Sequence, residues 1–184
     1  MFAVRACGFR ARCALEADDA GETRLDKIYR IIADARFGIH DLSRTELDEV
    51  TSLPRFNMPF ELGLFLGSKR FGDDDQKSKR CIVFDTEPYR CQKFISDLSG
   101  VDVMAHGGDP RQMVECTRNF LVTTSRRKSI PATKRLLDSY DRFTVGLGDI
   151  AHNAELDEAK LVFPDYERLV VEWIKLEALE GRLP

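Results

Sequence analysis

The stretch Cys81-Ile82-Val83-Phe84-Asp85 indicates a buried strand, because its apolar residues run almost without a break. Such runs are typical of the central strands of a parallel sheet, which are covered on both faces. Elsewhere in the chain, short apolar runs alternate with segments in which apolar residues recur at helical spacing. This alternation predicts right-handed βαβ units, and therefore an α/β fold with a parallel sheet and helices on both faces.

The other strands are predicted at residues 2–7, 37–42 and 101–105. Helices are expected after Thr23, around Glu61, between Tyr89 and Leu98, and after Asp109. Because about four strands are visible, too few for a barrel, we expect a flavodoxin-like sheet of about four or five strands.

The chain changes character after Ser125, where a basic segment is followed only by helical patterns. We therefore expect an α/β domain over residues 1–125 and a helical extension over residues 126–184. The last predicted helix follows Pro164 and carries an apolar stripe, which needs a partner. That partner is either the sheet domain or a second copy of the chain, so self-association through the C-terminal helices is expected.

The composition of the chain disfavours several classes of protein. The 184 residues carry a net charge of -3, which does not favour nucleic-acid binding. No apolar run approaches the ~20 residues needed to cross a membrane, and arginines near the N-terminus interrupt any signal-peptide pattern. The five cysteines form no Cys-x-x-Cys pair and the three histidines are scattered, so neither a disulfide framework nor a metal site is expected. These features predict a cytoplasmic protein.

Polar residues are predicted to gather at the carboxyl edge of the sheet, where ligands bind in open parallel sheets. The strand ends supply Gly8 with Phe9, Asp41 with Ser43, Asp85, and the turn His106-Gly107-Gly108. Asp41 suits sugar hydroxyls, with capping of nearby amides as the alternative. Asp85 suits a ligand contact or a structural turn. The turn before Pro110 suits an anion cradle, although Asp109 would also cap the following helix.

Glu61 is the single carboxylate in the apolar stretch from Asn57 to Gly67. Asn57 suits an N-cap and Pro59 suits the first turn, so Glu61 is predicted near the positive end of the helix dipole. A carboxylate held ionised there suits a nucleophile or a cation stabiliser. The alternative is that Glu61 only stabilises the helix, through the interaction of its charge with the helix dipole. Phe60 suits either a wall for a base or core packing.

The stretch Pro54-Arg55-Phe56-Asn57-Met58-Pro59-Phe60-Glu61-Leu62-Gly63-Leu64-Phe65-Leu66-Gly67 resembles the Asn-x-x-Phe-Glu-Leu/Ile-Gly helix of bacterial TIR-like domains. It is also similar to the small-Phe-Glu-Ile-Gly helix of nucleoside 2-deoxyribosyltransferases. In both groups the motif glutamate acts at an N-glycosidic bond, which implies that role for Glu61. The resemblance covers roughly residues 1–125. The loop after the first predicted strand lacks the usual Ser/Pro pattern, and the tail has no counterpart, which leaves the substrate and the role of the tail open.

The resulting hypothesis is an N-glycosidase that resembles NAD hydrolases or deoxyribosyltransferases, with NAD as a substrate rather than a cofactor. Glu61 is the expected catalytic residue. The expected substrate contacts are Gly8, Phe9, Asp41, Ser43, Asn57, Phe60 and Asp85. The alternative is a non-catalytic TIR-like signalling module that binds a nucleotide or oligomerises.

Overall fold

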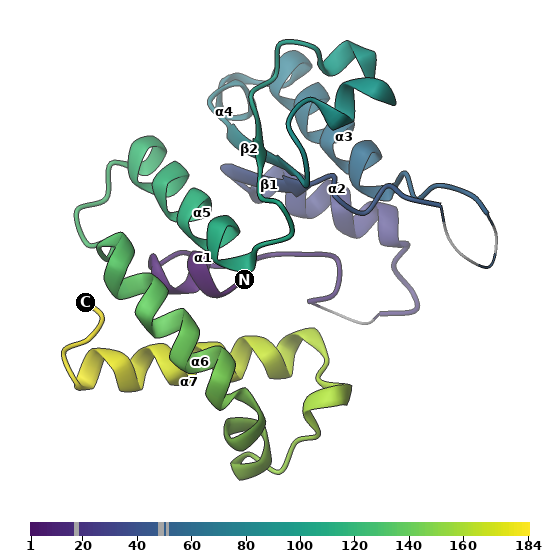
Figure 1. Cartoon of the computed structure of the whole chain (residues 1–184). Helices are drawn as coiled ribbons and strands as arrows, with labels where there is room; N and C mark the ends of the chain where they lie inside the picture. The colour runs from purple at the N-terminus through teal and green to yellow at the C-terminus, as the bar shows by residue number, and fades with distance from the viewer. Residues whose placement is uncertain (17–18, 48–49, 51) are drawn as a thin grey trace. The chain divides into compact units, whose positions relative to one another are not determined.

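The computed structural model describes residues 1–16, 19–47, 50 and 52–184 (Figure 1). The chain divides into two compact units. The first unit combines Met1–Asp19 with Val114–Pro184, and the second comprises Ala20–Met113. This division differs from the predicted boundary after residue 125, because the first residues of the chain belong with the C-terminal helices.

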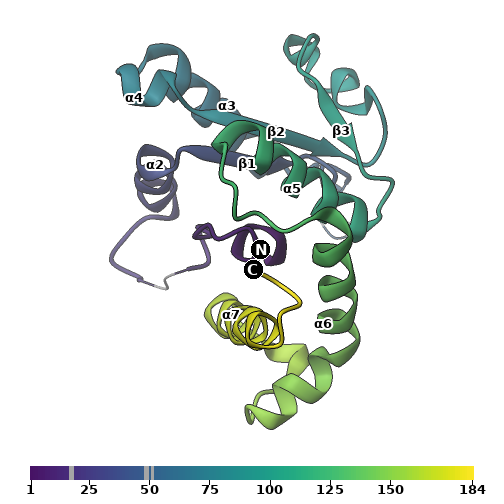
Figure 2. The same ribbon diagram turned by 90° about the vertical axis from the view of Figure 1, so that its left-hand side faces the viewer.

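The second unit contains a parallel sheet. Its described strands are β1 (Phe37–Asp41), β2 (Arg80–Asp85) and β3 (Val103–Ala105), hydrogen-bonded in that order (Figure 2). The register places Asp41 beside Phe84 and Asp85 beside Ala105, so the strands end close together at one edge. The α/β class and the parallel sheet are confirmed. The predicted number of four or five strands is wrong, since the described residues form a sheet of three strands.

Helical segments precede, connect and follow these strands. They are α2 (Arg24–Asp34), α3 (Asn57–Phe71), α4 (Asp74–Lys77), the 3-10 turns Arg90–Lys93 and Ser96–Leu98, and α5 (Pro110–Ser125), which continues into the first unit. The helix expected after Thr23 is confirmed as α2, and the Thr23 hydroxyl caps it by accepting the Asp26 N–H at 3.1 Å. The helix predicted between Tyr89 and Leu98 is wrong. Tyr89 has a left-handed φ of 61°, which does not propagate an α-helix, and only 3-10 turns follow.

Helix α3 packs closely on one face of the sheet. Alternation along β1 puts Gly38 and His40 on the same face, where the Phe65 ring meets the His40 ring at 5.2 Å between centroids. A Cβ at Gly38 would lie 2.7 Å from His40 Nε2 and 3.0 Å from the Phe65 ring. Glycine is therefore required at this position for α3 to approach the strand. The adjoining core is formed by Leu42, Leu62, Val83 and Cys91.

The first unit is helical. It contains α1 (Phe2–Ala6), the end of α5, α6 (Thr133–Asn153), a 3-10 turn (Glu158–Lys160) and α7 (Phe163–Leu179). Helices α6 and α7 cross in Figure 1, and both contact α1. The Phe143 ring packs against Phe2, Tyr166 and Trp173. Within the described residues, we find no helix with the length and apolar character of a membrane span.

The strand predicted at residues 2–7 is wrong, because Phe2–Ala6 is the helix α1. A short apolar run fits a buried strand and a buried helix equally well, and its neighbours decide between them. Here Phe2, Ala3 and Ala6 are buried among helices, with the Phe2 ring 5.3 Å from that of Tyr140. This helix accounts for one of the strands missing from the predicted sheet.

His40 is a buried imidazole whose two nitrogens have no hydrogen-bond partner. Burial lowers the pKa of His40 to about 4, from a usual value of 6.5. The unfolded chain therefore binds a proton between pH 6.5 and pH 4 that the folded chain does not bind. The sign follows: stability is complete above pH 6.5 and falls as the pH drops towards 4.

We expect the wild-type protein to lose about 2 kcal/mol more unfolding free energy between pH 7 and pH 5 than His40→Leu, which has no proton to bind. Urea unfolding at both pH values measures the difference. Equal losses in the two proteins would show that His40 does not titrate in this way.

Glu177 joins α6, α7 and the C-terminal residues of the first unit. Its buried carboxylate pairs with Arg142 and with Arg182, whose Nε lies 2.6 Å from Oε1. Burial alone raises the pKa of Glu177, but hydrogen bonds from both arginines and Ser139 outweigh it, so the pKa lies below its usual 4.5. The stabilisation is therefore present above pH 4.5 and is lost as the pH falls through the lowered pKa.

We expect Glu177→Gln to lower the unfolding free energy at pH 7 by about 2 kcal/mol, since the charge-assisted bonds are lost while the arginines keep access to water. Chemical denaturation measures this. Glu172→Gln, an exposed position on the same helix, serves as the control and should stay within about 0.5 kcal/mol of wild type. Equal stability of the two variants would refute a structural role for the cluster.

Candidate functional site

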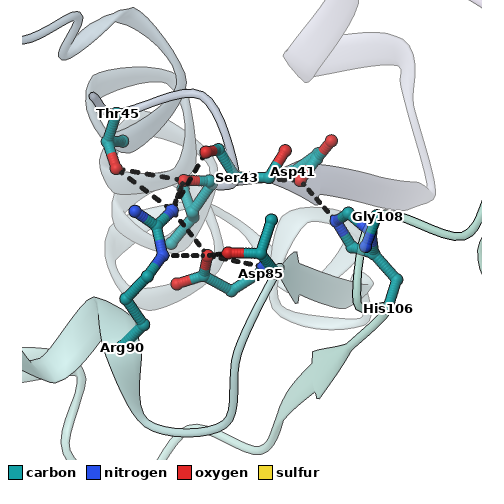
Figure 3. A network of polar contacts seen from close by, with 9 residues as sticks. Asp41, Ser43, Thr45, Asp85, Arg90, His106 and Gly108 are labelled. Atoms are coloured by element: carbon teal, nitrogen blue, oxygen red, sulfur yellow. Dashed lines mark hydrogen bonds and ion pairs between the residues drawn. The ribbon is translucent and has the colours of Figure 1, made fainter. Parts of the chain in front are cut away.

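A polar network covers the carboxyl ends of the strands in the second unit (Figure 3). Arg90 lies at its centre. Its Nε donates to Asp85 Oδ1 at 2.7 Å, and its Nη2 donates to the backbone oxygens of Leu42 and Ser43 at 2.9 and 3.0 Å. Because Asp85 ends β2 and Leu42 follows β1, this one side chain ties the two strand ends together.

Asp85 lies at the predicted edge, but its side chain is 0% exposed. Its Oδ1 accepts the Thr86 N–H at 2.7 Å as well as the Arg90 hydrogen bond, and its buried Oδ2 has no partner. The arrangement matches the structural alternative for this residue, since the carboxylate offers no surface to a ligand. It holds Arg90 in place instead.

Asp41 and Ser43 lie together, as expected of residues that follow the same strand. Asp41 Oδ1 accepts the Ser43 N–H at 3.0 Å, and 33% of the Asp41 side chain is exposed. Asp41 therefore caps the backbone and also faces solvent, so both sequence interpretations have a structural basis. Alternation along β1 places it on the face opposite to His40, which α3 covers.

His106 joins this group from the end of β3. Its ring is buried, with Nε2 3.5 Å from Asp41 Oδ1 and Nδ1 accepting the Gly108 N–H at 3.1 Å. Sequence reasoning singled out this residue only as part of a glycine turn, and it overlooked Arg90. A histidine directly after a strand, and an arginine five positions after a strand-ending aspartate, are the signals that identify them.

The turn at Gly107 and Gly108 does not form the expected anion cradle. Its N–H groups are used within the protein: Gly107 donates to Thr86 O at 3.0 Å, Gly108 to the His106 ring and Asp109 to His106 O at 2.8 Å. Asp109 Oδ1 accepts the Arg111 N–H at 2.8 Å, so it caps α5, as the alternative interpretation held. The turn therefore orients a histidine rather than a phosphate.

Glu61 lies in the second turn of α3. Asn57 is the first helical residue rather than the N-cap, which is Phe56, and the first turn contains no acid. Glu61 therefore lies farther from the positive end of the helix dipole than the sequence predicts. The Glu61 side chain is 19% exposed and pairs with Arg24 of α2 at 3.2 Å, while the Arg24 side chain is 59% exposed.

The expected contacts beside Glu61 are accessible. Asn57 is exposed, and Phe60 is 53% exposed, so Phe60 does not pack in the core. Phe56, one turn earlier on the same side, is 52% exposed. The start of α3 therefore presents two aromatic surfaces to solvent.

Gly8 and Phe9 belong to the first unit and follow a helix, not a strand, which removes the reason for expecting them at the sheet edge. Gly8 has a left-handed φ of 79°, and its carbonyl oxygen accepts a hydrogen bond from Arg127. The Arg127 guanidinium lies 4.5 Å from the centre of the Phe9 ring. The sites in the second unit are thus Asp41 with Ser43, Asp85 and His106, and the start of α3.

Cysteine chemistry is disfavoured at neutral pH. Burial raises the pKa of all five thiols, that of Cys7 to about 12. Over the ranges that the structure describes, no group of three histidine, cysteine or carboxylate side chains is placed to hold a metal ion.

We expect Arg90→Met to lower the unfolding free energy by about 3 kcal/mol, because it leaves the Asp85 carboxylate buried without its ion pair. The double variant Arg90→Met/Asp85→Asn should recover about 1 kcal/mol of this loss, since a neutral amide costs less to bury than a carboxylate. Urea denaturation of the wild type, the single variants Arg90→Met and Asp85→Asn, and the double variant measures the coupling. Strictly additive losses would contradict the ion pair as the reason for the loss.

Comparison of this chain with models of protein families, with curated proteins and with solved structures finds no match.

Proposed function

We propose that this chain cleaves the N-glycosidic bond of a nucleotide through Glu61, with NAD as the first substrate to test. The observation that carries the proposal is the setting of the Glu61 carboxylate. It keeps 19% of its surface exposed, and its partner is a largely exposed arginine. Ion pairs of this kind contribute little to stability, so a substrate can displace Arg24 at small cost.

The chemistry needs a carboxylate at the anomeric carbon. When the bond between this carbon and the nicotinamide nitrogen breaks, the electron pair leaves with the base and oxocarbenium character develops on the sugar. Glu61 forms an ester with the anomeric carbon or stabilises its charge. Water then supplies the hydroxyl group of the sugar product and releases one proton, so that NAD and water give nicotinamide, ADP-ribose and a proton.

Other residues of the second unit support this role. Asp41 is a partly exposed acceptor that suits sugar hydroxyls, with Ser43 beside it. Phe60 and Phe56 offer exposed aromatic surface near the start of α3, suited to a base. Asp85 acts indirectly, by holding Arg90 and thereby the backbone around Ser43.

The family proposal rests on the Glu61 helix. Within the predicted domain of residues 1–125, we assign the α/β unit Ala20–Met113, with its three-stranded sheet, to a TIR-like or deoxyribosyltransferase-like domain of the flavodoxin-like kind. We also propose self-association through the C-terminal helices in the cytoplasm. Exposed apolar side chains on α6 and α7 support it, namely Val145, Leu176 and Leu179.

A second candidate is a nucleotide-binding or oligomerising module without catalysis. The observation that favours it is the same Arg24–Glu61 ion pair, because an arginine that stays in place blocks the carboxylate. The two candidates differ in whether a base is released.

We expect the wild-type protein to release nicotinamide from NAD or a free base from a deoxynucleoside, and Glu61→Gln to lower the rate at least about 100-fold, because an amide cannot serve as the nucleophile. Chromatography of the released base, over a range of protein concentrations, measures turnover. Circular dichroism and urea unfolding verify that the variant folds.

Glu172→Gln is the matched control, since it makes the same chemical change at an exposed position of the first unit. It should keep the wild-type rate. Release by Glu61→Gln at the wild-type rate would exclude Glu61 as the catalytic group. Absence of release by the wild-type protein at every concentration, with nucleotide binding retained, would establish the binding module instead.

A further inference from the structure

The proton of the His106 ring has a defined position. The Gly108 N–H donates to Nδ1 at 3.1 Å, so this nitrogen uses its lone pair and carries no proton. A neutral ring then carries its proton on Nε2, which lies 3.5 Å from Asp41 Oδ1 (Figure 3). The backbone thus fixes the tautomer that turns an N–H towards Asp41.

The glycine turn is what makes this geometry available. Gly107 and Gly108 have φ values of 58° and 79°, in the left-handed region that favours glycine. These angles bring the Gly108 N–H back to the ring two residues earlier. The turn therefore holds the His106 ring in a fixed orientation.

His106 Nε2 is buried, so a ligand does not reach it directly. It has less than 1 Å² of exposed surface and no hydrogen bond of normal geometry. A separation of 3.5 Å is long for a hydrogen bond, and a shift of a few tenths of an ångström in Asp41 would satisfy the donor. Any influence of His106 on a ligand must therefore pass through Asp41.

The two oxygens of Asp41 differ. Oδ1 accepts the Ser43 N–H at 3.0 Å and faces His106 Nε2, whereas none of the described residues donates to Oδ2. Arg90 is not an alternative partner, because its guanidinium is committed to Asp85 and to two backbone oxygens. The Ser43 N–H therefore holds Oδ1, the His106 ring faces the same oxygen, and no lysine or arginine among the described residues pairs with the carboxylate.

We propose that His106 is a positioning residue that fixes Asp41, so that Asp41 Oδ2 accepts a hydrogen bond from a sugar hydroxyl of the nucleotide. This inference rests on the proposed function for the sugar, and it assigns His106 a role in substrate orientation rather than in the chemical step. A neutral donor suits the task, since it orients the carboxylate without cancelling the charge that strengthens its bond to a hydroxyl.

The first test needs no ligand. Two-dimensional ¹⁵N NMR of the ring nitrogens at pH 7.5 should show His106 protonated at Nε2 and unprotonated at Nδ1. Asp41→Asn should move the Nε2 resonance, and Gly108→Ala should lower the share of this tautomer, because alanine disfavours a φ of 79°. A ring protonated mainly at Nδ1 would overturn the proposal. So would an Nε2 chemical shift that is the same in the wild type and in Asp41→Asn.

The second test separates positioning from chemistry. His106→Phe keeps a ring but removes the donor, so KM for the cleaved nucleotide should rise about ten-fold while kcat stays within about three-fold. His106→Gln places an N–H near the position of Nε2 and should restore most of the affinity. His152→Phe, at an exposed histidine of α6, should match wild type.

A loss confined to kcat, or no rescue by glutamine in a folded variant, would contradict a positioning role. If the wild-type protein released no base, the proposed function would fail, whereas the NMR result would still decide whether His106 holds Asp41. The two failures are therefore distinguishable.

Discussion

The buried ion pair between Asp85 and Arg90 organises the polar edge of the sheet. A fully buried carboxylate is costly unless it is paired, and here the pairing uses an arginine that also binds the backbone after β1. The same residues set the local backbone, because His106 N–H donates to Asp85 O and Gly107 N–H to Thr86 O, both at 3.0 Å. The positions of Ser43 and His106 therefore both depend on the chain around Asp85.

Upon this frame, carboxylates take different roles according to their surroundings. Asp85 is buried and structural, Asp41 is partly exposed and accepts the Ser43 N–H, and Glu61 pairs with an exposed arginine. The residue proposed for the reaction is the one whose ion-pair partner is largely exposed to solvent. Stability and chemistry are thus assigned to different side chains of the same unit.

The sequence predicts the parts of this structure that depend on local pattern. The apolar run before Asp85 gives a central strand, and the polar residues after each strand give the edge at which Asp41 and His106 lie. The strand predicted at residues 2–7 is wrong, because so short an apolar run fits both a strand and a helix. The segment Phe2–Ala6 is helical and packs against Phe143 and Tyr140.

Contacts between distant residues escape such reasoning. Arg24 and Glu61 are 37 positions apart on two helices, and nothing in either segment specifies the pair. The exposure of Phe60 depends likewise on which side of α3 meets the sheet, which a short apolar helix does not reveal. The sequence therefore predicts the polar edge of the sheet, but not the contacts that connect the residues there.

The proposed reaction requires the Glu61 carboxylate to meet the sugar of a nucleotide. A crystal structure with a non-cleavable NAD analogue would show this contact. We expect a Glu61 oxygen about 3–3.5 Å from the anomeric carbon, with Arg24 displaced from the carboxylate. A bound analogue whose sugar lies away from Glu61, with the Arg24–Glu61 pair intact, would contradict it.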